Sequence, residues 1–129
     1  MNIWQLDYYN KVVREDSILT NSYVAGNIIE NAQKFNQMII DCKFTVGSLT
    51  DAQIKVEYSN DGTNYYQETF SSISGGTDTL SWGVHKLPAA DGNYSISLPV
   101  MAKYIKISAI GTGTVTGSSL AINARLGTR

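Results

Sequence analysis

The sequence has few of the residues from which active sites are commonly built, with one cysteine and one histidine in 129 residues. The lone Cys42 excludes an intrachain disulfide and any metal site made of several thiolates. The lone His85 excludes a metal site of several imidazoles, and His85 and Cys42 could in principle meet as base and nucleophile. Cys42 alternates with Ile40 and Phe44, so we expect its thiol among core side chains, where a thiolate is disfavoured. We therefore expect no cofactor, no metal and no enzymatic activity.

Charged residues are also scarce. They make up 16% of the chain, against about 25% in an average globular domain. Ten basic and eleven acidic residues give a net charge of -1, and no cluster of Lys or Arg is present that could neutralise a row of phosphates. Ser, Thr, Asn, Gly and Tyr are abundant instead, which favours strands and turns over helices. We expect no binding to nucleic acid.

Long hydrophobic runs are missing as well. No segment approaches the ~18 apolar residues of a membrane helix, and residues 98–102 form one of the longest apolar runs. The start of the chain, Met1 to Asp7, is mixed and already acidic, unlike a secretory signal with a basic start and an apolar centre. These features predict a soluble protein made in a cytoplasm, with no membrane partner.

What the chain does have is alternation of apolar and polar residues, the pattern of strands with one buried face. About six segments after residue 34 show it, and the first 33 residues have room for about two more, which predicts a single all-β domain over residues 1–129. Two antiparallel sheets facing each other form a sandwich. About eight strands favour the jelly roll, with an immunoglobulin-like sandwich as the alternative. The patterned segments are residues 35–46, 53–59, 79–85, 94–100, 103–110 and 120–126.

The clearest element is residues 53–66, a strand that runs into a turn and out again. Ile54, Val56 and Tyr58 occupy alternate positions, so one face of this strand is suited to a core. Asp61-Gly62 then predicts the reversal, because Gly62 can adopt the positive φ that a short hairpin connection needs. Later in the chain, residues 111–117 predict a second hairpin, and Pro99 predicts that its strand lies at a sheet edge or ends there.

Residues 1–33 are the least regular part of the chain. Their aromatic and apolar side chains either pack across the core or bury themselves against another subunit. Under the second alternative the protein interface contains residues 1–25, and a helix can be drawn over residues 28–34. The side chains that we expect at such an interface are Trp4, Leu6, Tyr8, Tyr9 and Val12.

Three predictions concern the middle of the chain. Ser71 to Asp78 has the composition of a loop, which we expect to be mobile and which is a secondary candidate for protein contact. Trp82 shares the apolar parity of its segment and is predicted in the core, whereas His85 has the polar parity and is predicted to be solvated. Tyr65 and Tyr66 could offer a ring for stacking on a sugar, although neighbouring strand positions place one inward and the other outward.

Two stretches carry a resemblance to a known family. Lys55-Val56-Glu57-Tyr58-Ser59-Asn60-Asp61-Gly62-Thr63-Asn64-Tyr65 resembles the strand and turn of discoidin-type, galactose-binding-like sandwiches. Ala102-Lys103-Tyr104-Ile105-Lys106-Ile107 resembles a later strand of the same domains. The resemblance implies a carbohydrate-binding module in which the turn region and Tyr65 or Tyr66 form a shallow site.

The same two stretches lie between a long early strand and a Gly- and Thr-rich connection that leads into residues 120–127. In this arrangement the chain also resembles the jelly-roll head-decoration, or cement, proteins of tailed bacteriophages. That resemblance implies a virion location, capsid protein as the partner and self-association as a homo-oligomer, with a trimer favoured. The leading hypothesis is therefore a non-enzymatic capsid decoration protein, and a carbohydrate-binding module is the alternative.

Overall fold

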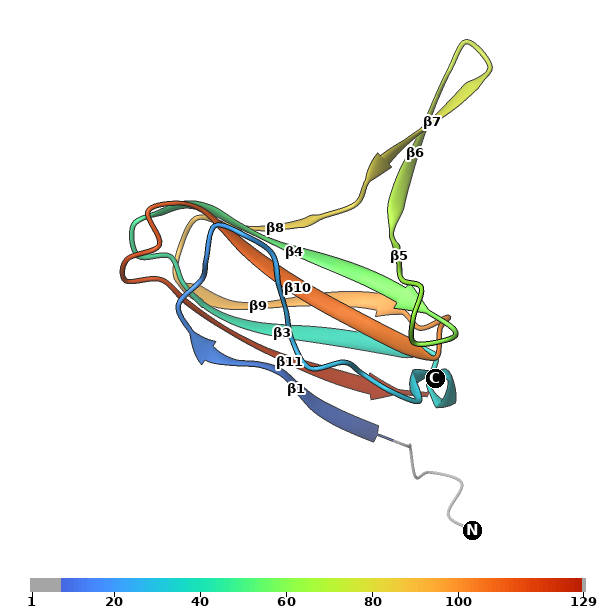
Figure 1. The fold of residues 1–129 in the computed structure, drawn as a ribbon, viewed down its shortest axis with the longest axis horizontal. Coiled ribbons are helices and arrows are strands. Elements are labelled where there is room, and N and C mark those ends of the chain that lie inside the picture. Colours follow the sequence, from blue (N-terminus) through green and yellow to red (C-terminus); the bar gives the residue numbers. More distant parts are fainter. Residues whose placement is uncertain (1–7, 129) are drawn as a thin grey trace.

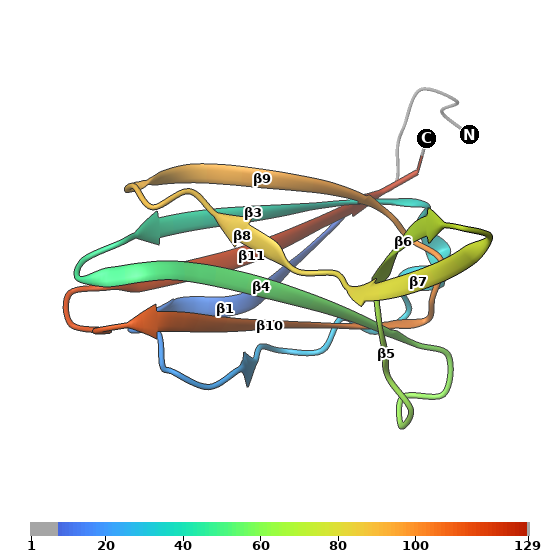
Figure 2. The same ribbon diagram turned by 90° about the horizontal axis from the view of Figure 1, so that it is seen from above.

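Two antiparallel sheets face each other in the computed structural model, which describes residues 8–128 (Figures 1 and 2). A separate two-stranded ribbon projects from one side of them. The elements are β1 (Tyr8–Ser17), β2 (Val24–Ala25), a 3-10 turn η1 (Ala32–Lys34), β3 (Gln37–Thr45), β4 (Leu49–Ser59), β5 (Tyr66–Gln67), β6 (Thr69–Ser74), β7 (Thr77–Trp82), β8 (His85–Leu87), β9 (Gly92–Pro99), β10 (Tyr104–Gly113) and β11 (Ser119–Gly127).

The connectivity of the two sheets is that of a jelly roll. One sheet has the strand order β1-β11-β3-β9, and the other has the order β2-β10-β4-β5, with β8 also paired to β4. The chain passes from one sheet to the other between β1 and β2, between β2 and β3, and between β3 and β4, and again around β9, β10 and β11. The predicted all-β jelly-roll sandwich is confirmed. The immunoglobulin-like alternative is wrong, because that fold keeps strands A and B together in one sheet.

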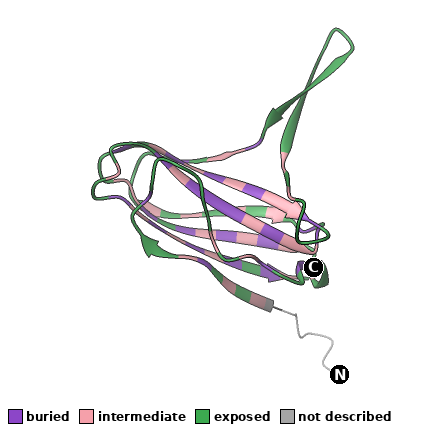
Figure 3. Cartoon of the chain, in the orientation of Figure 1, coloured by how far each residue is buried: buried purple, intermediate pink, exposed green. Residues whose placement is uncertain are grey.

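The core lies between the sheets and is built from the predicted alternation (Figure 3). In β3, and in β4 from Ala52 to Val56, every second side chain is buried, and Pro99 ends β9 at the edge of its sheet, as expected. Cys42 is buried at 2% exposure, and its burial, followed by the charge of Asp41, raises the pKa of its thiol to about 12. The largest fully buried side chains are Phe44, Leu19, Ile29, Met38, Ile40, Ile54, Ile105, Ile107, Leu120, Ile122, Leu126 and Val13.

Two predicted connections differ from the structure. Residues 111–117 do not close a hairpin, because β10 and β11 belong to different sheets and the segment crosses between them. The helix drawn over residues 28–34 is reduced to the single turn η1, because Ile29 instead forms a bridge with Ile105 of β10. Both errors have one cause: local sequence describes a turn or a short apolar run but does not reveal which sheet the next residue joins.

The predicted reversal after β4 is present and is built around Asp61. Its carboxylate accepts hydrogen bonds from the backbone N–H groups of Asn64 and Thr63, each at 2.8 Å, and from the amide side chain of Asn64 at 2.8 Å. These bonds, with one to Ser59, hold the pKa of Asp61 well below its ordinary range. Gly62 has a φ of 76°, as the turn requires. β5 then returns along β4, with Tyr66 opposite Tyr58.

Candidate interaction surface

The ribbon formed by β6 and β7, called the arm below (residues 69–82), is the most exposed part of the described chain. It extends away from the sandwich (Figure 1), and every residue in its two strands is exposed (Figure 3). Its strands pair with each other through six residue pairs, from Thr69 opposite Trp82 to Ser74 opposite Thr77. The prediction of a loop over Ser71 to Asp78 is wrong, because Gly75 and Gly76 both have positive φ and close a regular hairpin.

The two faces of the arm differ in chemistry. Residues that are paired across two antiparallel strands point to the same side, and the side alternates along each strand. Ile73, Leu80 and Trp82 therefore share one face, where they are 75%, 61% and 72% exposed, and the paired positions on that face are occupied by Thr69, Ser71 and Asp78. The other face carries the hydroxyl groups of five Ser and Thr residues together with Phe70, which is 56% exposed. The arm thus presents an apolar face without a core to cover it.

Trp82 is the clearest correction to the sequence-based expectations. It does share parity with Leu80, as predicted, but the face that they share points into solvent. Parity shows which residues lie on one side of a strand and does not show whether that side is covered. The two adjacent glycines between alternating segments are a hairpin signal that could have revealed the arm.

The arm is an insertion in the edge strand of the second sheet. β5 and β8 both pair with β4 in the same direction, and between them the N–H of Glu68 donates to the carbonyl of Val56 at 3.3 Å. Continuing the β5 register places Glu68 opposite Val56, and extending the β8 register backwards places Val84 opposite Lys55. Residues 69–83 therefore interrupt what would otherwise be one continuous strand.

Polar contacts fasten the base of the arm. The N–H of Gly83 donates to the carbonyl of Glu68 at 2.8 Å, and the side-chain amide of Gln67 donates to the carbonyl of Gly83 at 3.1 Å. His85 Nε2 lies 2.6 Å from Glu68 Oε1, and both side chains are largely covered. The prediction that His85 is solvated is therefore wrong. His85 is paired with Ile54 of β4, whose side chain faces the core, so the imidazole lies on the same side of the sheet and contacts a carboxylate there. These contacts hold together the point from which the arm leaves the sheet.

The interface residues expected in the first part of the chain have separate locations. Trp4 and Leu6 lie outside the described residues, and of Tyr8 the structure describes the backbone of β1. Tyr9 packs against the core and stacks on Phe35 with ring centroids 6.1 Å apart, which agrees with the alternative of own-core packing. Val12 is 47% exposed on the outer side of β1. In the same segment Ile18, Tyr23 and Val24 are 52%, 36% and 43% exposed.

The two tyrosines of the suggested sugar site are both accessible but unequal. Tyr66 is 71% exposed. Tyr65 is half-buried, and the ammonium of Lys106 lies 4.1 Å from its ring centroid. One face of Tyr65 is thereby occupied by a cation, so Tyr66 is the ring with more surface available for stacking.

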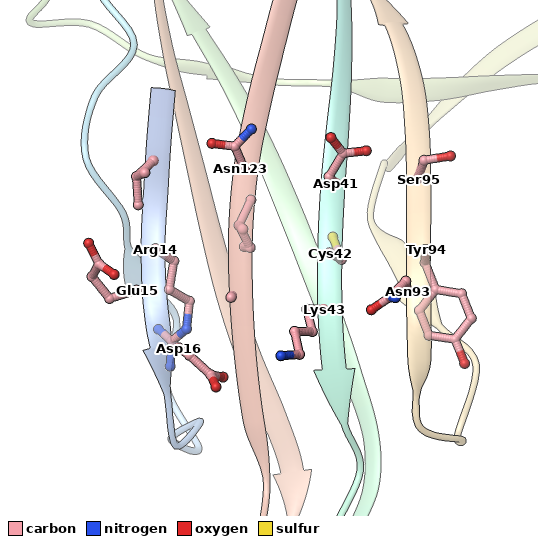
Figure 4. A pocket seen from close by; sticks show the side chains of 13 residues that line it. Arg14, Glu15, Asp16, Asp41, Cys42, Lys43, Asn93, Tyr94, Ser95 and Asn123 are labelled. Atoms are coloured by element: carbon pink, nitrogen blue, oxygen red, sulfur yellow. The ribbon is translucent and has the colours of Figure 1, made fainter. Parts of the chain in front are cut away.

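A shallow hollow of about 580 Å³ lies on the outer face of the sheet β1-β11-β3-β9 (Figure 4). Polar side chains from all four strands line it, among them Arg14, Asp41, Asn93 and Asn123. Two of these groups already have partners: Arg14 Nε donates to the carbonyl of Leu120 at 2.9 Å, and Asp41 receives two hydrogen bonds from Arg125 at 2.6 and 3.1 Å. The hollow can offer hydrogen bonds to a polar surface.

No group of three or more His, Cys, Asp or Glu residues within 8–128 is arranged to hold a metal ion. In the same part of the chain, no helix has the length and apolar character needed to cross a membrane. Cys42 and His85, the pair considered from the sequence, do not meet: the thiol is in the core, and the imidazole is bound to Glu68.

Comparison with known proteins shows a likeness of fold. No family model matches the chain, and no curated protein sequence matches it. Among solved structures, the crystal structure of the SPBc2 prophage-derived protein YomS is similar, with a TM-score of 0.55 and 12% sequence identity. The match covers 98% of this chain and 98% of that protein. Two chains of very different sequence therefore share the arrangement of the whole domain.

Proposed function

We propose that this chain is a non-enzymatic structural protein of a bacteriophage particle, of the capsid decoration type, that binds protein partners through its arm. The observation that carries the proposal is the exposed apolar face of Ile73, Leu80 and Trp82. Such a face costs free energy in water, and its exposure is typical of a site that binds another protein. The partners would be capsid protein and further copies of the chain, with a trimer favoured.

The chemistry of the arm fits the apolar surface of a protein better than nucleic acid or another highly charged partner. Asp78 is the one charged residue within residues 69–82, so the arm has little attraction for nucleic acid or for an anionic surface. Trp and Phe are enriched at the centres of protein interfaces, where they contribute much of the binding energy. The prophage origin of the YomS protein, which has a similar fold along its whole length, supports the association with phage.

The test uses particles of the phage or prophage whose genome encodes the chain. Particles assembled without the gene are mixed with purified protein, sedimented, and the bound protein is measured against the major capsid protein. Wild-type protein is expected to sediment with the particles in many copies. A variant lacking residues 69–83 and a Leu80→Ser/Trp82→Ser variant are expected not to sediment, whereas Ile18→Ser, which removes an apolar side chain that is 52% exposed away from the arm, is the matched control. Wild-type protein that stays in the supernatant would contradict the proposal.

A carbohydrate-binding module of the galactose-binding-like type is the second candidate, because Tyr66 is 71% exposed beside the turn. A sugar can stack on a tyrosine ring only if a face of the ring is open to solvent. Jelly rolls also occur among lectin domains. A glycan array probes this directly. Binding that is lost in Tyr66→Ala and kept in the variant lacking residues 69–83 would favour this function over the first.

A further inference from the structure

The strand β9 forms an edge of the first sheet that is open to pairing. Its one neighbour within the described residues is β3, to which it pairs from Gly92 to Pro99 without a register shift. None of its residues is charged, and a proline stands only at its last position. Natural proteins usually protect an edge with charges, a bulge or an interior proline, because exposed N–H and C=O groups otherwise recruit another strand.

The opposite edge of the same sheet shows what protection looks like. β1 carries Lys11, Arg14, Glu15 and Asp16 and is interrupted by register shifts on either side of Arg14. In addition, Asn27 donates from its side chain to the carbonyl of Val12 at 3.0 Å and from its backbone to the carbonyl of Val13 at 2.8 Å. The two edges belong to one sheet, and β9 alone of the two remains regular and uncharged.

The arm has the pattern that would continue β9. On β9, Tyr94, Ile96 and Leu98 are half-buried on the core side. Their outward neighbours are Asn93, Ser95 and Ser97, all of which are exposed. On β7 the apolar face has Leu80 and Trp82, and the opposite face has Thr77, Thr79 and Ser81.

If β7 were added beside β9, Leu80 and Trp82 would therefore meet apolar side chains, and hydroxyl groups would meet Ser and Asn. Such like pairs stabilise neighbouring strands. Asp78 shares the face of Leu80 and Trp82 and would lie at one end of this apolar row. Asp78 would be the one charge brought by either strand, so no pair of like charges would arise. β7 is also free to pair, because within the described residues it is bonded to β6 alone.

We propose that the arm of one copy adds its β7 edge to the β9 edge of a second copy, with Leu80 and Trp82 lying over the half-buried Ile96 and Leu98 of that copy. The inference rests on the proposed protein-binding role of the arm and names a second copy as its partner. The arm points away from its own sandwich (Figure 1), so the β9 edge that it joins belongs to another molecule. Strand addition of this kind gains affinity from main-chain hydrogen bonds and specificity from the alternate side chains.

The surface area of the arm agrees with this role. Trp82, at 72% exposure, leaves roughly 150 Å² in solvent if an aromatic side chain has about 150–250 Å². Ile73 and Leu80 bring the apolar surface of this face to roughly 350 Å², within the range of the largest patch on a monomer. Since an interface is about 60% apolar, this surface corresponds to about 600 Å² per partner, the lower end of the range for stable interfaces.

The β7 edge and the β9 edge are different surfaces, so the contact between two copies is heterologous. Such a contact closes into a ring when the rotation from one copy to the next permits. A trimer is one such ring. This geometry separates the proposal from two symmetric alternatives, in which one arm pairs with another arm or one β9 pairs with another β9.

The test combines two defective variants. The Leu80→Ser/Trp82→Ser variant has a defective arm and an intact β9 edge. The Asn93→Lys/Ser95→Lys variant has an intact arm and a β9 edge that carries charges. Light scattering is expected to give an oligomer for wild type and the chain mass of 14.1 kDa for each variant alone. An equimolar mixture is expected to give a species of twice that mass, because one intact arm meets one intact edge. Ser22→Lys, an exposed substitution outside both surfaces, is the control and is expected to oligomerise like wild type.

A monomeric wild type would overturn the inference, and so would an unchanged oligomer in the Asn93→Lys/Ser95→Lys variant. A mixture in which both variants stay monomeric would also overturn it, provided that each variant shows the circular dichroism and unfolding temperature of wild type. Hydrogen exchange gives a second readout if a variant is poorly folded, since the amides of β7 and β9 in the wild-type oligomer should exchange more slowly after assembly. Failure here is distinguishable from failure of the proposed function. Arm-dependent sedimentation with phage particles by a monomeric protein would keep the function and reject the second copy as the partner.

Discussion

The sandwich and the arm have the same alternation of apolar and polar residues, but the apolar side chains are buried in the sandwich and exposed in the arm. In β3 the alternate residues Met38, Ile40 and Phe44 are at most 2% exposed, whereas in β7 the alternate residues Leu80 and Trp82 are 61% and 72% exposed. The strands of the sandwich have a second sheet over their apolar side, and those of the arm have none. An apolar face stabilises the fold where the chain covers it, and where the chain leaves it exposed it is the surface that we propose binds a partner.

The largest effect that tests this comparison is expected in the sandwich. Phe44 is fully buried between the sheets, so Phe44→Ala should lower the free energy of unfolding by about 3–5 kcal/mol through lost burial and the cavity left behind. Urea unfolding followed by circular dichroism of the β-sheets measures the change. A loss below about 1 kcal/mol would mean that the interior is loosely packed, since a closely packed core is sensitive to the removal of even one methylene.

The base of the arm should respond less strongly. His85→Ala removes the 2.6 Å contact with Glu68 and should cost about 1 kcal/mol, the net contribution of a typical hydrogen bond. Amide exchange in β5 and β8 should become faster, while that in β3 and β11 stays unchanged. His85→Gln, which can still donate a hydrogen bond to the carboxylate, is the control, and equal acceleration in both variants would show that the contact does not fasten the arm.

The turn at Asp61 makes the second sheet sensitive to acid. Because folding lowers the pKa of Asp61, its stabilising contribution is present above about pH 4, the ordinary pKa of an unfolded aspartate, and is lost progressively as the pH falls below that value. The thermal unfolding temperature of Asp61→Asn should therefore lie below that of wild type at pH 7. The gap should narrow on acidification. A gap that is constant from pH 7 to pH 3 would contradict this role of the carboxylate.

The smallest effect on stability is expected in the arm. Trp82→Ser removes a side chain that is 72% exposed, so the unfolding free energy of the monomer should change by no more than about 0.5 kcal/mol. Unfolding is measured at a concentration at which the protein is monomeric. A loss of several kcal/mol would show that Trp82 belongs to the fold rather than to an interface.

Much of the sandwich could be predicted from the sequence, because a covered sheet imposes alternation on its strands. Cys42 was placed correctly by its parity with Ile40 and Phe44, and the position of Pro99 correctly indicated an edge. The exchange of strands between the two sheets was not visible, since the turn that follows β10 has the same local chemistry whether β11 pairs beside it or in the facing sheet.

The exposure of the arm is hidden for a different reason, although its two adjacent glycines signal a hairpin. Its Ser- and Gly-rich centre has the composition of a loop, and nothing local distinguishes an apolar parity that faces a core from one that faces solvent. Trp82 was wrongly placed in the core on that ground. Of the five interface residues expected in the first part of the chain, Tyr9 packs against the core and Val12 is 47% exposed. Their role at an interface stays a prediction, and the surface that we propose for binding lies in residues 69–82.

The most direct measurement is the mass in solution of wild type and of a variant lacking residues 69–83. The deletion joins Glu68 to Val84 and restores one continuous register along β4, so the sandwich should fold without the arm. We expect an oligomer for wild type and a folded monomer of unchanged unfolding temperature for the deletion variant. A monomeric wild type, or an oligomer that persists without the arm, would contradict this expectation.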